Sequence, residues 1–154
     1  MRYLIMLAIM TGAAFPAWAD ERLPPIKNEM VAKECGACHM AFQPQFLPQE
    51  SWRKVMDTLP SHFGEDASLP EASRREIADY LLANAGDVSQ SREGKKFARS
   101  IGNGPLPLRI TEVPRWVREH REVRAKAWLD PRVRGKANCQ ACHRGAGFGL
   151  YDDD

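Results

Sequence analysis

All four cysteines of the 154-residue chain lie in two copies of one pattern, Cys-x-x-Cys-His. The two copies comprise Cys35, Cys38 and His39, and Cys139, Cys142 and His143. In c-type haem attachment, the two thiols of this pattern add to the two vinyl groups along one porphyrin edge, and the next residue places its imidazole beneath the iron. Because two matches use every cysteine, the sequence predicts two covalently bound haem c groups, each with its iron.

Other roles for these cysteines are weaker. The two pairs together have the donors for one zinc ion, but they are 104 positions apart, and an all-cysteine site does not need the histidine after each pair. Local disulfides are also compatible with an exported chain. A thioredoxin-like dithiol expects a βαβ pattern around the motif, which neither copy has. We favour haem, with zinc and disulfides as the alternatives.

The first 19 residues predict export. Arg2 provides a short positive start, an apolar run follows, and the segment from Ala17 to Ala19 is a small-residue cleavage pattern. The run is too short for a stable membrane span, although an uncleaved anchor is the alternative, and no other stretch approaches the ~20 apolar residues that a span needs. We therefore expect a signal peptide at 1–19 and a periplasmic protein of about 135 residues, without a membrane span.

Two six-coordinate irons need two further ligands, and the histidines outside the motifs are His62 and His120. Met40 directly follows the first motif and cannot reach the opposite face of the same haem. No methionine follows Met56. Met56 is therefore a competitor of His62 at the first haem, whereas the second haem takes a histidine, an unusual lysine or no sixth ligand.

The position of His62, between the first motif and a helix expected at 70–86, resembles the order in a small class I cytochrome c, whose loop usually offers Met. By elimination, we pair His120 with His143; a swapped arrangement, in which each second histidine crosses to the other unit, stays open. Histidine in place of Met lowers the haem potential. Ligation on both faces leaves no open position for a substrate, which favours outer-sphere electron transfer.

The rest of the chain predicts helices and almost no alternating strand pattern. In the last expected helix, Trp116, His120 and Val123 share one face, and the charged neighbours Arg118 and Glu119 point to water. Ser51 is expected to cap the second helix, and 86–113 to be a polar connection. We expect helices at 26–39, 52–59, 70–86 and 111–130, within an N-terminal haem domain at 20–86 and a C-terminal haem domain at 87–154.

The charges are distributed unevenly along the chain. Residues 20–90 contain 7 Lys or Arg against 12 Asp or Glu, whereas residues 91–154 contain 14 against 8. Such a dipole orients a charged partner during encounter; the other interpretation is that the basic half neutralises the haem propionates. Export and the lack of a recognisable binding fold argue against a nucleic-acid partner.

Six segments together resemble the bacterial dihaem cytochrome c (DHC) family. They are CGACHMAFQPQFLPQESW, HFGEDASLP, IADYLL, RITEVPRWVREH, ANCQACH and the YDDD end. The resemblance covers nearly the whole mature chain. It implies an all-α periplasmic protein with a class I cytochrome c-like N-terminal haem unit and a helical-hairpin C-terminal haem unit.

The resemblance also implies two low-potential bis-histidine haems, with His39 paired with His62 and His143 paired with His120. It implies an electron-transfer protein rather than an enzyme, with a small oxygen-binding haem protein as acceptor and a membrane cytochrome b as upstream donor. The alternative is a dihaem peroxidase-type enzyme with one open haem. Phe42 stands where the family is expected to have Tyr, which puts a hydrogen bond from that hydroxyl in doubt.

Overall fold

The computed structural model describes residues 22–152, and this part of the chain is helical with two isolated β-bridges. The signal peptide predicted at 1–19 lies outside it. No helix within the described range has the length and apolarity to cross a membrane. The α-helices are α1 (Glu29–Cys35), α2 (Gln49–Asp57), α3 (Glu71–Ala83), α4 (Arg92–Ile101), α5 (Pro114–Glu119) and α6 (Ala125–Trp128). The 3-10 turns are η1 (Pro44–Phe46), η2 (Leu59–Ser61), η3 (Ile110–Glu112), η4 (Cys139–Ala141) and η5 (Ala146–Phe148).

The first three α-helices pack together and follow the expected order, and α3 contacts both α1 and α2. Asn28 caps α1, because its side-chain oxygen accepts a hydrogen bond from the Val31 backbone N–H at 2.9 Å. The expected cap of α2 was wrong: Ser51 is buried inside the helix. The helix instead begins at Gln49, whose backbone N–H donates to the Asp87 carboxylate at 3.0 Å, so a residue far along the chain satisfies its N-terminus.

The polar connection expected at 86–113 contains α4, which the sequence analysis missed. Ser91 caps this helix by accepting a hydrogen bond from the Gly94 N–H at 3.1 Å, and Phe97 is buried. Gly94 lowers the local helix propensity, but the packing requires it: a Cβ there would lie 2.8 Å from the Cβ of Gln45. This close approach seats α4 against η1.

The long helix expected at 111–130 is interrupted. α5 ends at Glu119, His120 is its C-terminal capping residue, and α6 follows as a separate turn of helix. Val117 is 52% exposed and Val123 is 37% exposed, so the apolar side chains that would anchor a longer helix face outward. The expectation that Val123 shares one helix face with Trp116 and His120 was therefore wrong, because Val123 lies beyond the end of α5. Short helices depend on tertiary contacts, and residues 121–126, which follow the end of α5, are all exposed.

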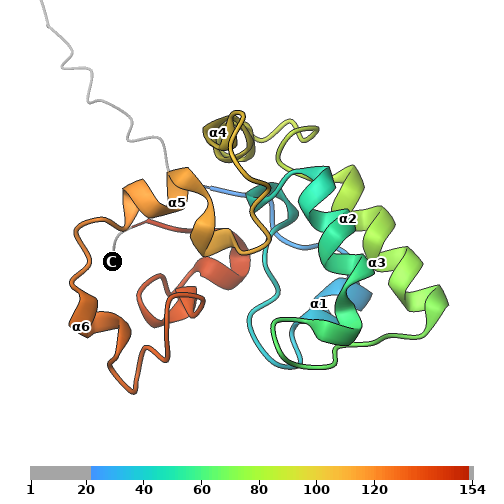
Figure 1. The fold of residues 1–154 in the computed structure, drawn as a ribbon, viewed down its shortest axis with the longest axis horizontal. Helices are drawn as coiled ribbons and strands as arrows, with labels where there is room; N and C mark the ends of the chain where they lie inside the picture. The colour runs from blue at the N-terminus through green and yellow to red at the C-terminus, as the bar shows by residue number, and fades with distance from the viewer. Residues whose placement is uncertain (1–21, 153–154) are drawn as a thin grey trace, which may run out of the picture.

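The apolar core is continuous across both halves of the chain. Buried residues from α3, α4 and α5, such as Ile77, Phe97 and Trp116, belong to one cluster. The Leu23 N–H donates to the Gly149 carbonyl at 2.9 Å, which ties the start of the described chain to its end. Figure 1 shows α1, α2 and α3 on one side, α5 and α6 on the other, and α4 between them. The all-α fold is confirmed, and the domain boundary near residue 86 stays a prediction.

Candidate functional site

The first Cys-x-x-Cys-His motif begins at the last residue of α1. Cys35 packs at the edge of the core, whereas Cys38 is exposed. Burial, with a smaller contribution from the Glu34 charge, raises the pKa of the Cys35 thiol. The Nδ1–H of His39 donates to the Met40 carbonyl at 2.7 Å. Because a carbonyl only accepts, this bond fixes the tautomer and leaves Nε2 as the nitrogen that can bind a metal.

His62 lies in the loop between η2 and α3. Its backbone N–H donates to the Glu65 carbonyl at 2.7 Å, and the Glu65 N–H donates back at 3.1 Å. Burial, followed by the charges of His39 and Arg109, lowers the pKa of the His62 imidazole. The imidazole is thereby favoured in its neutral form, which is the form that ligates iron.

The rings of His39 and His62 lie near each other, with centroids 6.3 Å apart and planes inclined by 20°. A metal–imidazole bond of about 2.1 Å, plus the distance from nitrogen to ring centre, places two trans imidazole centroids about 6.4 Å apart. The spacing of the two rings therefore fits an iron between them. Phe42 stacks on His39 at 5.0 Å. The competitor Met56 is 4% exposed and belongs to the apolar core on α2.

The second motif is not in an α-helix. Cys139 opens η4, and the His143 backbone N–H donates to the Cys139 carbonyl at 2.8 Å. Burial is the main cause that raises the pKa of Cys139 to about 11. The Nδ1–H of His143 donates to the Asp152 carbonyl at 3.3 Å. His143 is thus oriented in the same way as His39, but by a residue nine positions away.

His120 is held by an aromatic cluster at the end of α5. Its imidazole stacks on the Trp116 indole with centroids 4.1 Å apart and planes inclined by 13°. Its Nδ1–H donates to the Trp116 carbonyl at 2.9 Å, which again leaves Nε2 for a metal. Trp128 lies 6.1 Å from the same ring. The centroid of His143 is 6.1 Å from that of His120, at an interplanar angle of 83°, so this pair also has the separation of trans ligands.

A buried ion pair supports the helix that ends at His120. Arg115 on α5 donates from Nη2 to the Glu93 carboxylate on α4 at 2.9 Å, and both side chains are about one-tenth exposed. Lys96 also pairs with Glu93, and the Arg115 N–H donates to the Ser100 hydroxyl at 3.1 Å. The sequence analysis missed this pair, because two charges 22 positions apart produce no local pattern.

One polar contact joins the surroundings of the two motifs. Gln43 is fully buried; its amide Nε2 donates to the Ala146 carbonyl at 3.0 Å, and its Oε1 accepts from the Tyr151 hydroxyl. Burial raises the pKa of Tyr151 and keeps this hydroxyl protonated. Gln43 follows Phe42, which stacks on the first motif, whereas the Tyr151 ring lies 5.8 Å from that of His143. No sequence signal predicted this contact.

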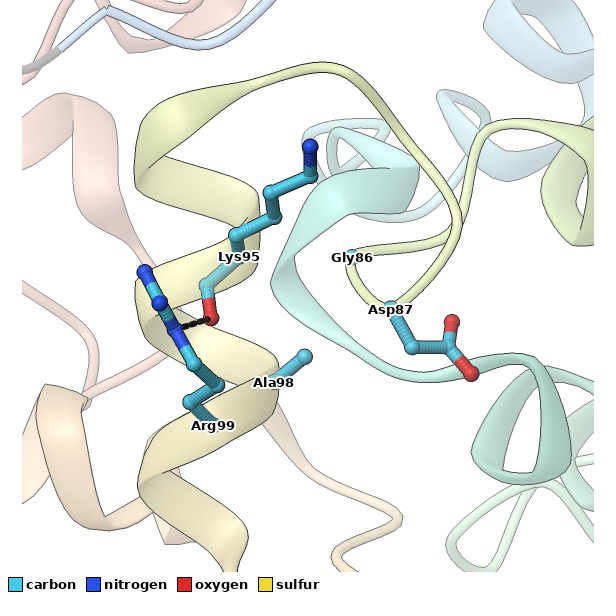
Figure 2. Close-up of a pocket in the computed structure, with 5 residues that line it drawn as sticks. All are labelled: Gly86, Asp87, Lys95, Ala98 and Arg99. Carbon is cyan, nitrogen blue, oxygen red and sulfur yellow. Dashed lines mark hydrogen bonds between the residues drawn. The ribbon is translucent and has the colours of Figure 1, made fainter.

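The alternative chemistries are less compatible with the arrangement. Within residues 22–152, no three His, Cys, Asp or Glu side chains are placed to hold a metal ion, which a zinc site requires but a haem iron, bound by the porphyrin, does not. The raised pKa of Cys35 and Cys139 is the opposite of the lowered pKa of a reactive dithiol. An open hollow at Gly86, Asp87 and Arg99 contains none of the motif residues (Figure 2).

Comparisons with known proteins found one matching family model and several similar solved structures. A family model described as dihaem cytochrome c matches residues 31–151. A solved diheme cytochrome c from Rhodobacter sphaeroides is 41% identical, with 83% of this chain and 99% of that chain covered and a TM-score of 0.71. DHC purified from Rhodobacter sphaeroides is 42% identical, with 82% and 98% covered and a TM-score of 0.67. A diheme cytochrome type c from Shewanella baltica OS155 is 31% identical, with 81% and 87% covered and a TM-score of 0.66. No curated protein sequence matches.

Proposed function

Because the chain belongs to the dihaem cytochrome c family, we propose that it transfers electrons through two covalently attached haem c groups with histidine on both faces of each iron. Each haem supplies a one-electron redox centre when bound. One haem is held in residues 20–86 and the other in residues 87–154. The thioether cysteines are Cys35, Cys38, Cys139 and Cys142, and the axial pairs are His39 with His62 and His143 with His120.

The observation that carries this proposal is the spacing of the four imidazoles. The centroid separations of 6.3 Å and 6.1 Å both match the value for trans ligands of one iron. In His39, His120 and His143 the Nδ1–H is engaged by a backbone carbonyl, so the chain orients each ring as a ligand. The pairs lie within each half of the chain, which supports the unswapped arrangement.

This ligation favours low reduction potentials and outer-sphere transfer. Histidine in place of Met as an axial ligand lowers the potential, because imidazole stabilises the ferric state better than a thioether. With His39 and His62 on one iron and His143 and His120 on the other, neither haem would offer a position to oxygen or peroxide. The role is therefore electron relay rather than catalysis, and a dihaem peroxidase-type enzyme, which needs one exchangeable ligand, is the alternative.

Carbon monoxide binding to the reduced holoprotein tests the proposal. We expect an unchanged Soret band at neutral pH and a pyridine haemochrome count of two haems per chain. A Soret shift in the wild-type protein would contradict closed ligation and favour the peroxidase-type alternative. A count below two would contradict covalent attachment at both motifs. The His120→Ala variant, which opens one iron, serves as the positive control because its Soret band should shift.

We further propose a periplasmic location after signal-peptide removal, with a small oxygen-binding haem protein as acceptor and a membrane cytochrome b as donor. The charge asymmetry supports an electrostatic encounter, and Arg118 and Arg121, with side chains 51% and 68% exposed, lie next to His120. The electron-transfer rate should fall as salt rises over the physiological range. Arg121→Gln should reduce this salt dependence, whereas Arg75→Gln on α3 should not; a rate that ignores salt would contradict steering.

A further inference from the structure

A cation from the second half of the chain lies at the first histidine pair. The Arg109 guanidinium lies over the Phe63 ring, with Cζ 3.8 Å from the ring centroid. Phe63 directly follows His62, and the two rings are 4.7 Å apart. Arg109 thus reaches the surroundings of His62 although it lies 46 positions after Phe63 in the sequence.

Both sides of this contact are held in place by the fold. Arg109 precedes η3, which is anchored by the buried side chains of Ile110 and Val113, and its carbonyl accepts from the Glu112 N–H at 3.0 Å. Phe63 has a positive φ of 54°, an uncommon conformation for a side-chain-bearing residue. The paired backbone bonds of the His62 loop maintain it. The Arg109 side chain is 49% exposed and Phe63 is 45% exposed, so the contact is a surface cation–π pair whose two backbone segments are fixed by the fold.

We propose that the positive charge of Arg109 raises the reduction potential of the haem held between His39 and His62. The inference rests on the proposed function, because it assumes that these histidines ligate that haem. A fixed positive charge near an iron favours the reduced state, which carries one positive charge less, and this interaction is stronger at a protein surface of reduced polarity than in water. Stacking on Phe63 adds a cation–π attraction that fixes the guanidinium.

The neighbouring acid does not cancel this charge. The Glu112 carboxylate is 3.7 Å from the Arg109 Nε, and its side chain is 56% exposed. Exposed pairs interact weakly because water screens them, whereas the stacked face of the guanidinium is turned toward Phe63. The basic second half of the chain thereby acts on the first haem through one defined residue, in addition to any action on a partner.

The test is a spectroelectrochemical titration of the two-haem protein and its variants. The wave of the first haem is identified as the one that rises in the His62→Met variant. Arg109→Gln should lower the potential of that haem and leave the other unchanged, whereas Arg109→Lys, which keeps the charge, should stay close to wild type. Phe63→Leu, which removes the stacking ring, should produce a smaller fall in the same wave.

Arg99→Gln is the matched control. Arg99 also belongs to the basic half, and on α4 it donates from Nε to the Lys95 carbonyl at 3.1 Å (Figure 2). Its removal should move neither potential. The proposal is overturned if Arg109→Gln leaves the first potential unchanged, if both potentials fall together, or if Arg109→Lys falls as far as Arg109→Gln. Two low-spin haems in the wild-type protein would at the same time uphold the proposed function, so the two failures are distinguishable.

Discussion

The two candidate haem sites contain the same Cys-x-x-Cys-His pattern, but the structure supports their second histidines differently. His62 lies in an irregular loop that is closed by paired backbone hydrogen bonds to Glu65. His120 terminates α5 and is held by the stacked Trp116 ring and the Trp116 carbonyl. The first site therefore depends mainly on local contacts of one loop, whereas the second depends on an aromatic cluster and on the helix that presents it.

The local structure of the motif differs as well. The first motif begins at the end of the α-helix α1, whereas the second begins in the 3-10 turn η4. Haem attachment constrains two thiols and one imidazole over five residues, and it places no demand on the backbone further away. This chemistry therefore fixes the motif itself. The surrounding fold determines where the distant histidine lies and how its ring is oriented.

Removing one second histidine should have the largest effect and should separate the sites. His62→Ala and His120→Ala should each convert one of the two low-spin ferric haems to a five-coordinate or water-ligated form and raise its potential, because an imidazole ligand is lost. Electronic absorption and a redox titration measure both changes. Unaltered low-spin spectra in either variant would show that the ligand assignment at that position is wrong.

The ion pair below α5 should affect the second site far more than the first. Glu93→Ala removes the buried carboxylate that pairs with Arg115, while the Glu119 carboxylate stays 3.4 Å from Arg115 Nη1; it should destabilise the protein by up to about 3–5 kcal/mol, measured by chemical denaturation of the holoprotein. In that experiment His120 should dissociate from its iron at a lower denaturant concentration than His62. Glu71→Ala, which breaks a pair on the exposed side of α3, is the control and should change stability far less, because water screens exposed pairs; equal losses would contradict the assigned role.

The contact between Gln43 and Tyr151 should stabilise both sites together. Tyr151→Phe leaves the buried Gln43 oxygen without its donor, which should cost about 1–3 kcal/mol of unfolding free energy. Tyr80→Phe is the matched control, because the Tyr80 hydroxyl accepts from the Lys27 N–H in an exposed position. A larger loss of unfolding free energy in Tyr80→Phe than in Tyr151→Phe would contradict the role of Gln43 and Tyr151 in stabilising both sites.

The smallest expected effect is spectroscopic and leaves the free energy of unfolding unchanged. The imidazole planes are inclined by 20° at the first pair and by 83° at the second. Nearly parallel planes act on one iron d orbital of π symmetry, whereas nearly perpendicular planes act on two equally. Ferric EPR should therefore contain one rhombic low-spin signal and one strongly anisotropic signal with a large maximum g value. Two signals of the same type would show that haem binding equalises the planes.

Much of the site could be predicted from sequence because the chemistry is local. A covalent haem needs its two thiols and its first imidazole at fixed neighbouring positions, so Cys35, Cys139 and their companions are recognisable without a fold. Counting the remaining histidines then singled out His62 and His120, and their role as axial ligands stays a prediction. The family and the all-α class followed from the motifs and are confirmed.

The missed features all involve partners distant in sequence. Gly94 lowers the helix propensity of its segment, so α4 was not predicted. The close contact with Gln45 is nevertheless what requires a glycine at this position. Arg115 pairs with Glu93, which lies on another helix 22 positions away in the sequence.

Residue types at short spacing are enough to predict the cofactor class, the number of haems and the candidate ligands, because this chemistry is local. Only the tertiary structure decided where α5 stops, how the two imidazole planes are inclined and which cation lies beside His62. Those properties arise from burial and packing between segments such as Phe63 and Arg109, which are brought together only when the continuous core forms.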